Sequence, residues 1–133
     1  MSQPATGPAA RAAVKDMWQT FFNGAIPIPR RLGLLQDGPQ FASFVHAQDK
    51  TSLGALVLAA SAKVSAVALR PPGGASVRFS VLLAGKPVAK NLSGTAVYVG
   101  GRWLVAKTTF CTLLRVAYGK KSHVIPAACG GHG

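Results

Sequence analysis

Acidic residues are nearly absent from this sequence. Its 133 residues include no glutamate and three aspartates, Asp16, Asp37 and Asp49, against fifteen lysines and arginines, which gives a formal net charge of +12. Paired catalytic carboxylates and carboxylate metal sites therefore have few residues from which to be built. A protein with this charge attracts polyanions in a salt-dependent way.

The basic residues do not form a dense run. Only Arg30–Arg31 and Lys120–Lys121 are adjacent in the sequence, whereas nucleic-acid-binding domains more often show a basic stripe with interleaved aromatic residues. We therefore expect a cell-surface polyanion or a lipid head group to be at least as plausible a partner as nucleic acid.

Motifs for cofactors, metals and membrane spans are also missing. The chain contains no P-loop, no GxGxxG and no Ser-His-Asp arrangement. Cys129, His123 and His132 lie near one another in the sequence but lack the usual zinc-ligand spacing. No apolar run reaches the roughly 18 residues that a membrane helix needs. The sequence thus predicts no cofactor, no metal and no transmembrane segment.

The two cysteines, Cys111 and Cys129, predict one disulfide, since an even count fits an oxidising compartment. The alternative is two free thiols. The first eight residues have no signal-peptide hydrophobic region, so either the protein is cytoplasmic or an export leader is absent from this chain. The predicted disulfide favours a secreted or cell-surface protein.

The first half of the chain has helical patterning. Residues 9–23 are predicted to form a helix that Gly24 ends, with a wide apolar stripe typical of core packing: Val14, Met17, Trp18, Phe21 and Phe22. Short helical turns are expected at 30–35 and from residue 39. Residues 51–60 form either another short helix or, at 56–58, a strand.

The second half has strand patterning. Strands are predicted at 64–70, 76–83, 88–99 and 102–107, with an irregularity at 91–94 and a tight hairpin at Gly100–Gly101. Thr108 and Thr109 are expected to cap a last short helix, whose apolar face includes Phe110 and Leu113.

These elements predict one domain of the α+β class. N-terminal helices would pack in a curved, mainly antiparallel four-stranded sheet, and a short C-terminal helix would close one end. Residues 1–8 would be a flexible linker that packs on nothing, 9–117 the domain, and 118–133 an irregular tail tied by the disulfide.

Several motifs resemble those of a known superfamily. The stretch from Gly100 to Val105, with its Gly-Gly-x-Trp-x-Val pattern, resembles the closing hairpin of the nuclear-transport-factor-two-like fold, which is a cone-shaped α+β architecture. The Phe22-Asn23-Gly24 helix end and the Thr109-Phe110-Cys111 closure are similar to an actinobacterial group of that fold, the secreted low-molecular-weight antigens.

This resemblance implies an exported, non-enzymatic binding or interaction domain. The ligand is unassigned: a small apolar molecule, a cell-surface polyanion or a protein partner would each fit. A ligand pocket inside the cone would be walled by Trp18, Phe22, Phe79 and Trp103. The fold also implies a homodimer through the outer face of the sheet.

Two other functions remain open. Enzymes of this fold commonly use an Asp or a His–Asp pair as general base, and His46 and Asp49 are spaced to share one face of a helix. An isomerase or dehydratase would require one of them to point into a cavity. A polyanion or nucleic-acid binder would instead require the basic residues to converge on one face.

A thiol count tests the predicted disulfide. Denatured protein without reductant is expected to show no reactive thiol, and reduction should destabilise the fold by roughly 3 kcal/mol, as expected for a loop of this length. Two reactive thiols before reduction would refute the pairing of Cys111 with Cys129.

Overall fold

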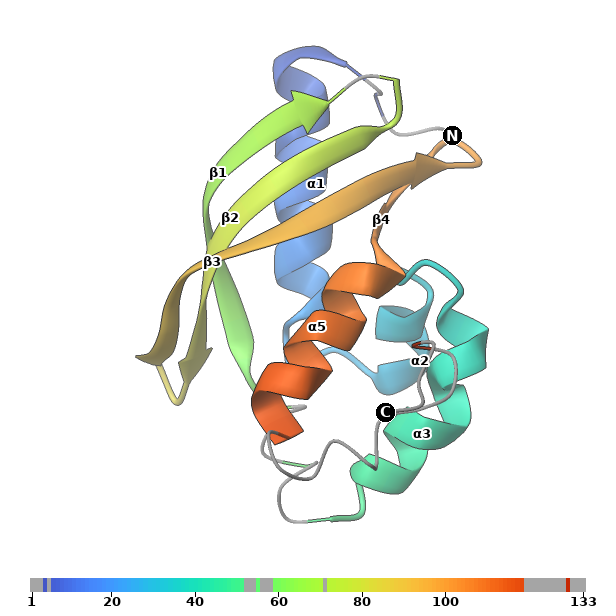
Figure 1. The fold of residues 1–133 in the computed structure, drawn as a ribbon, viewed down its shortest axis with the longest axis vertical. Helices are drawn as coiled ribbons and strands as arrows, with labels where there is room; N and C mark the ends of the chain where they lie inside the picture. Colours follow the sequence, from blue (N-terminus) through green and yellow to red (C-terminus); the bar gives the residue numbers. More distant parts are fainter. Residues whose placement is uncertain are drawn as a thin grey trace.

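The architecture is a four-stranded antiparallel sheet curved over one long helix, with the smaller helices gathered at one end (Figure 1). The structure is a computed structural model that describes residues 4, 6–51, 55, 59–70, 72–118 and 129. The α+β class, with helices before strands and a short helix after them, is as predicted.

The helices precede the sheet, apart from the last one. They are α1 (Gly7–Phe21), α2 (Ile28–Leu32), the 3-10 helix η1 (Gly38–Phe41), α3 (Ala42–Gln48) and the terminal α5 (Lys107–Tyr118). In the described part of the chain, no helix is long and apolar enough to cross a membrane.

Helix α1 buries the predicted apolar stripe. Val14, Met17, Trp18 and Phe21 are buried, and Phe22, just beyond the helix, is half-buried. The helix begins at Gly7 with Pro8 in its first turn, where a missing N–H costs nothing. The prediction that residues 1–8 pack on nothing is wrong for Pro4, whose carbonyl accepts a 2.8 Å hydrogen bond from the indole of Trp103.

The sheet has the strand order β1-β2-β3-β4, with β1 (Ser61–Arg70), β2 (Gly74–Leu83), β3 (Lys86–Val99) and β4 (Arg102–Val105). Gly100 and Gly101 both have positive φ, as the predicted tight hairpin requires. The irregularity predicted at 91–94 is a register shift between β2 and β3, where Asn91 adopts a left-handed φ of 56°. Such a shift bends the strand locally.

Helix α5 begins one residue earlier than the predicted cap. The helix starts at Lys107, so Thr109 lies inside it. The side-chain oxygen of Thr109 accepts a hydrogen bond from the backbone N–H of Thr95, and Ala106 N–H donates to the carbonyl of Thr95. Strand β4 ends at Val105, which pairs with Ala96, so Thr95 lies just beyond the paired part of β3. The two bonds satisfy the backbone N–H and carbonyl of Thr95 in place of a strand partner.

A parallel bridge that the sequence did not indicate joins the helical end to the sheet. Leu35 pairs with Val105, through bonds from Val105 N–H to the carbonyl of Leu34 and from Gln36 N–H to the carbonyl of Val105, both 2.8 Å. Most of the predicted element at 51–60 and of the tail at 118–133 lies outside the described residues.

Trp18 occupies the centre of the core. Its ring lies 5.1 Å from that of Phe79 on β2, edge to face, and both side chains are fully buried. On β3, an added Cβ at Gly94 would lie 2.7 Å from the indole of Trp18 and 2.8 Å from a methyl of Thr109. Only glycine lets the strand approach this closely.

Replacing Gly94 with alanine is therefore expected to destabilise the protein by about 1–3 kcal/mol, the usual cost of overpacking. Gly73→Ala is the matched control, because its added Cβ meets only one atom at 3.8 Å; its effect should be below about 1 kcal/mol. Urea unfolding of both variants measures this. Equal stabilities for the two would mean that the strand tolerates a larger separation from Trp18.

Candidate functional site

The described residues line an apolar, partly open cavity of about 90 Å³ where the end of α1 meets α2, α3 and α5. The four helical segments supply nearly all of its wall, and Ala60 just before β1 completes it. The lining residues are Phe21, Phe22, Ile28, Arg31, Leu32, Val45, Ala60, Phe110, Leu113 and Leu114.

Aromatic packing holds this wall together. The ring of Phe110 lies 5.1 Å from that of Phe41 and 5.8 Å from that of Phe21, both edge to face. Such pairs contribute about 0.5–1.5 kcal/mol each beyond the area they bury. Leu113 and Leu114 follow Phe110 at helical spacing and so face the same side of α5.

Arg31 is the one charged residue among the described lining residues. Its side chain comes from α2 and is half-buried. Desolvation by burial lowers the pKa of the Arg31 guanidinium, and the negative charge of Asp49 partly offsets this effect. The guanidinium stays charged at physiological pH, because its unperturbed pKa is far above neutrality. The cavity therefore combines an apolar interior with one cation that is partly withdrawn from water.

Of the four residues predicted to form a pocket wall, only one lines this cavity among the described residues. Phe22 lines it, whereas Trp18, Phe79 and Trp103 do not. Those three side chains are at most 1% exposed, because they fill the space between α1 and the sheet. The sequence did not identify Arg31 or the leucines of α5 as pocket residues. The helical spacing of Phe110, Leu113 and Leu114 was the available signal, and it predicted only an apolar face.

His46 and Asp49 do not meet the requirement for a catalytic pair. His46 lies in α3 and Asp49 directly follows that helix; both are exposed, and neither lines the cavity. The enzyme alternative required one of them to point into a cavity, and neither does, so these two residues do not support it. The described part of the chain also contains no cluster of three potential metal ligands.

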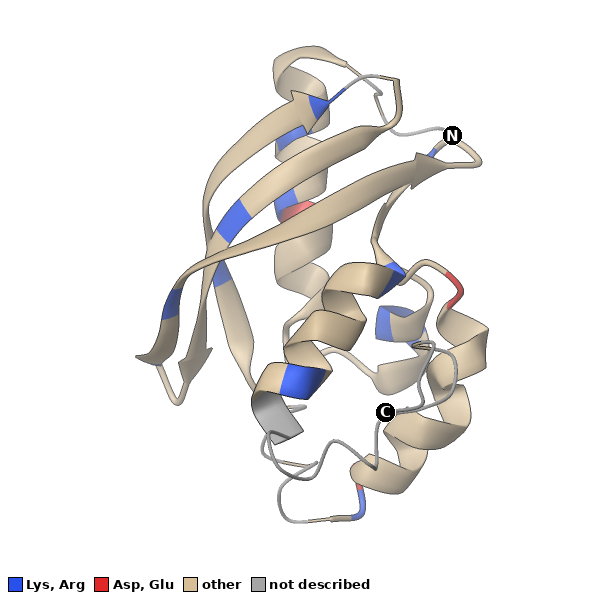
Figure 2. Ribbon diagram, in the orientation of Figure 1, with Lys and Arg blue, Asp and Glu red and all other residues tan. Residues whose placement is uncertain are grey.

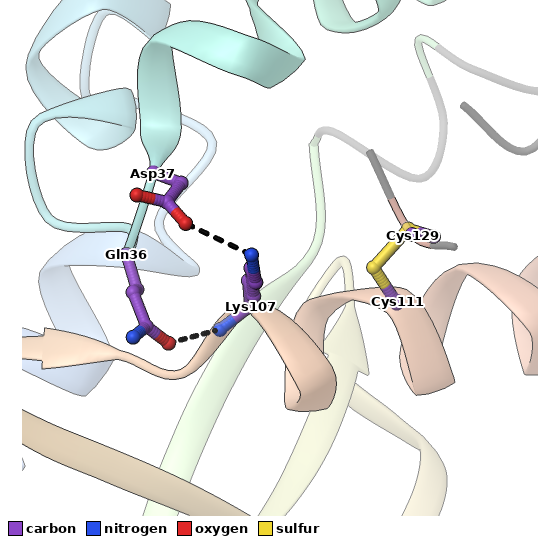
Figure 3. A network of polar contacts seen from close by, with 5 residues as sticks. All are labelled: Gln36, Asp37, Lys107, Cys111 and Cys129. Carbon is purple, nitrogen blue, oxygen red and sulfur yellow. Dashed lines mark hydrogen bonds and ion pairs between the residues drawn. A yellow bond between two sulfur atoms is a disulfide. The ribbon is translucent and has the colours of Figure 1, made fainter. Parts of the chain in front are cut away.

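Polar contacts and a disulfide fix α5 against the rest of the domain (Figure 3). Lys107 Nζ forms a 3.0 Å ion pair with Asp37, and Lys107 N–H donates to the side-chain oxygen of Gln36 at 3.2 Å. One turn further on, Cys111 is bonded to Cys129, as predicted, with an S–S distance of 2.02 Å. Arg115 also donates to the carbonyl of Cys129 at 3.2 Å.

Comparison with known families gives one match across most of the chain. The family model for the low molecular weight antigen MTB12, C-terminal domain, matches residues 6–121. No curated protein matches the chain. The matched range includes every described helix and strand, and therefore every described residue of the cavity wall.

The cavity itself can be tested with xenon, because dry apolar cavities bind it; an engineered cavity of about 150 Å³ takes xenon or benzene. Under xenon pressure, the methyl NMR signals of Val45, Leu113 and Leu114 are expected to shift saturably. The methyls of Val88, which is 57% exposed, should shift weakly and linearly. A uniform response across all these methyls would show that the space is filled.

Proposed function

Because the chain belongs to the family of the low molecular weight antigen MTB12 C-terminal domain, we propose that it is a non-enzymatic domain that acts outside the cytoplasm. We further propose that it binds a small amphiphilic ligand, with an alkyl group and a carboxylate. The bond between Cys111 and Cys129 supports the location, because disulfides persist in oxidising compartments.

We also assign the domain to the nuclear-transport-factor-two-like superfamily as a proposal. Its support is the order of the elements, in which helices precede a meander of antiparallel strands that curves over α1 (Figure 1). The cavity between the end of α1 and α2, α3 and α5 lies where the smaller helices gather at one end of the sheet (Figure 1).

The pairing of Arg31 with apolar side chains carries the proposed function. Arg31 and Phe22 line the same cavity as Leu113, so a ligand that contacts the apolar wall also comes close to a cation. A partly desolvated guanidinium gains more from a carboxylate than a solvated one does, and the pair can be bidentate. A fully apolar ligand would leave that interaction unused.

The volume limits the size of the alkyl group. At about 90 Å³, the cavity is smaller than the roughly 150 Å³ that accommodates benzene. We therefore propose that it takes a short alkyl chain, or the end of a longer one.

Titration of labelled protein with hexanoate, followed by NMR, tests this function. Hexanoate is expected to produce saturable shifts at cavity residues. Hexanol, which lacks the charge, should bind about tenfold more weakly, and acetate, which lacks the chain, should not saturate.

Two pairs of variants separate the cavity from the rest of the surface. Leu113→Trp should fill the cavity and abolish hexanoate binding, while Val116→Trp, at a position on the same helix that is 66% exposed, should leave it unchanged. Arg31→Gln should weaken hexanoate about tenfold, and Arg30→Gln, at the adjacent exposed position, should not. Equal effects within either pair would overturn the assignment of this site.

A further inference from the structure

A second concave surface lies on the face of the sheet opposite α1. Ser76 pairs with Thr95, and Arg78 pairs with Ser93, so these four side chains share one face. The alternate residues of β2, Ala75, Val77 and Phe79, are buried. The polar residues are thus presented on the side of the sheet that α1 does not cover.

Arg70 and α5 complete a polar groove on this face. Arg70 Nε donates a 3.3 Å hydrogen bond to Ser76 Oγ, which brings the guanidinium from β1 over β2. Thr108 and Thr112 of α5 form the other side, and the groove has a volume of about 450 Å³. Its described lining residues have guanidinium and hydroxyl groups and no aromatic ring.

The groove contains no negative charge. The three acids of the whole chain, Asp16, Asp37 and Asp49, lie in α1, directly before η1 and directly after α3. Figure 2 shows basic positions on β1, β2 and β3 and no acidic position on any strand. The positive charges on this face therefore have no carboxylate on the sheet to neutralise them.

The cations are staggered along the two neighbouring strands β1 and β2. Arg70 pairs with Gly74, Arg78 lies four residues further along β2, and Lys63 pairs with Ser80. At about 3.3 Å per residue, Arg70 and Arg78 are separated by about 13 Å along the strand direction, and Lys63 follows after about 7 Å. A row of separated cations is suited to a ligand that carries several anionic groups along its length.

We propose that this groove binds a linear anionic glycan through its sulfate or phosphate esters. Arginine side chains bind such oxyanions with two parallel hydrogen bonds. The serine and threonine hydroxyls both donate and accept hydrogen bonds, which suits sugar hydroxyls. Among the described residues, the groove offers no aromatic side chain for base stacking, which single-stranded nucleic acids favour. A second copy of the chain would bring like charges together.

A heparin-derived octasaccharide is the probe, with single-stranded oligo(dT) and anionic vesicles as competing ligands. Arg70→Gln/Arg78→Gln is expected to weaken octasaccharide binding at least tenfold at fixed salt. Arg11→Gln/Lys15→Gln removes the same charge from exposed positions of α1 and should change binding less than about twofold. NMR shifts on adding the octasaccharide should centre on Ser93, Thr95 and Thr112.

Three outcomes would overturn the proposal. Equal losses for the two double variants would show that net charge alone binds the glycan. Tighter binding of oligo(dT) than of the octasaccharide would indicate a nucleic-acid surface, and binding to anionic vesicles alone would indicate a lipid surface. Thr112→Val keeps every charge, and a severalfold loss in this variant would support direct recognition of the glycan by the groove.

Discussion

The contact of Trp18 with Gly94 is the constraint on which the other elements depend. The indole is fully buried, and Gly94 allows β3 to cross it at a distance that no other residue would permit. Thr109 packs on the same glycine while its side-chain oxygen holds Thr95 N–H. One position thereby sets the separation of α1, the sheet and α5. Trp18 Nε1 is also buried without a hydrogen bond among the described residues, which costs about 1–3 kcal/mol.

Helix α5 serves both proposed binding surfaces. Phe110, Leu113 and Leu114 face the apolar cavity, while Thr108 and Thr112 line the polar groove. The helix is held near its start by Gln36 and Asp37 and one turn later by the disulfide, so it is anchored at two points as one rigid element. A small ligand in the cavity and a glycan in the groove would therefore both contact one rigid element, on different sides.

The sequence was most informative where a pattern is local. Alternating apolar residues predicted the four strands, and two glycines predicted the hairpin at 100–101, because strand period and positive φ depend on a few neighbouring residues. The prediction failed at Thr108 and Thr109, where threonine hydroxyls before a helical pattern indicated a cap. Thr109 instead binds the edge of β3, and that edge is exposed only because β4 stops at Val105. No local pattern carries this information.

The sequence by itself determined the α+β class, the apolar faces, the cysteine pair and the shortage of acids, since each is a property of residue type or short-range spacing. Only the tertiary structure decided which apolar residues fill the core and which line a cavity. Trp18, Phe79 and Trp103 have the size and character of a pocket wall, yet the sheet closes over them. Arg70 and Arg78 are eight positions apart and appear dispersed in the sequence, but antiparallel pairing places them on one face with Lys63. Strand register creates such neighbours, and it depends on how distant segments pack rather than on the residues beside each charge.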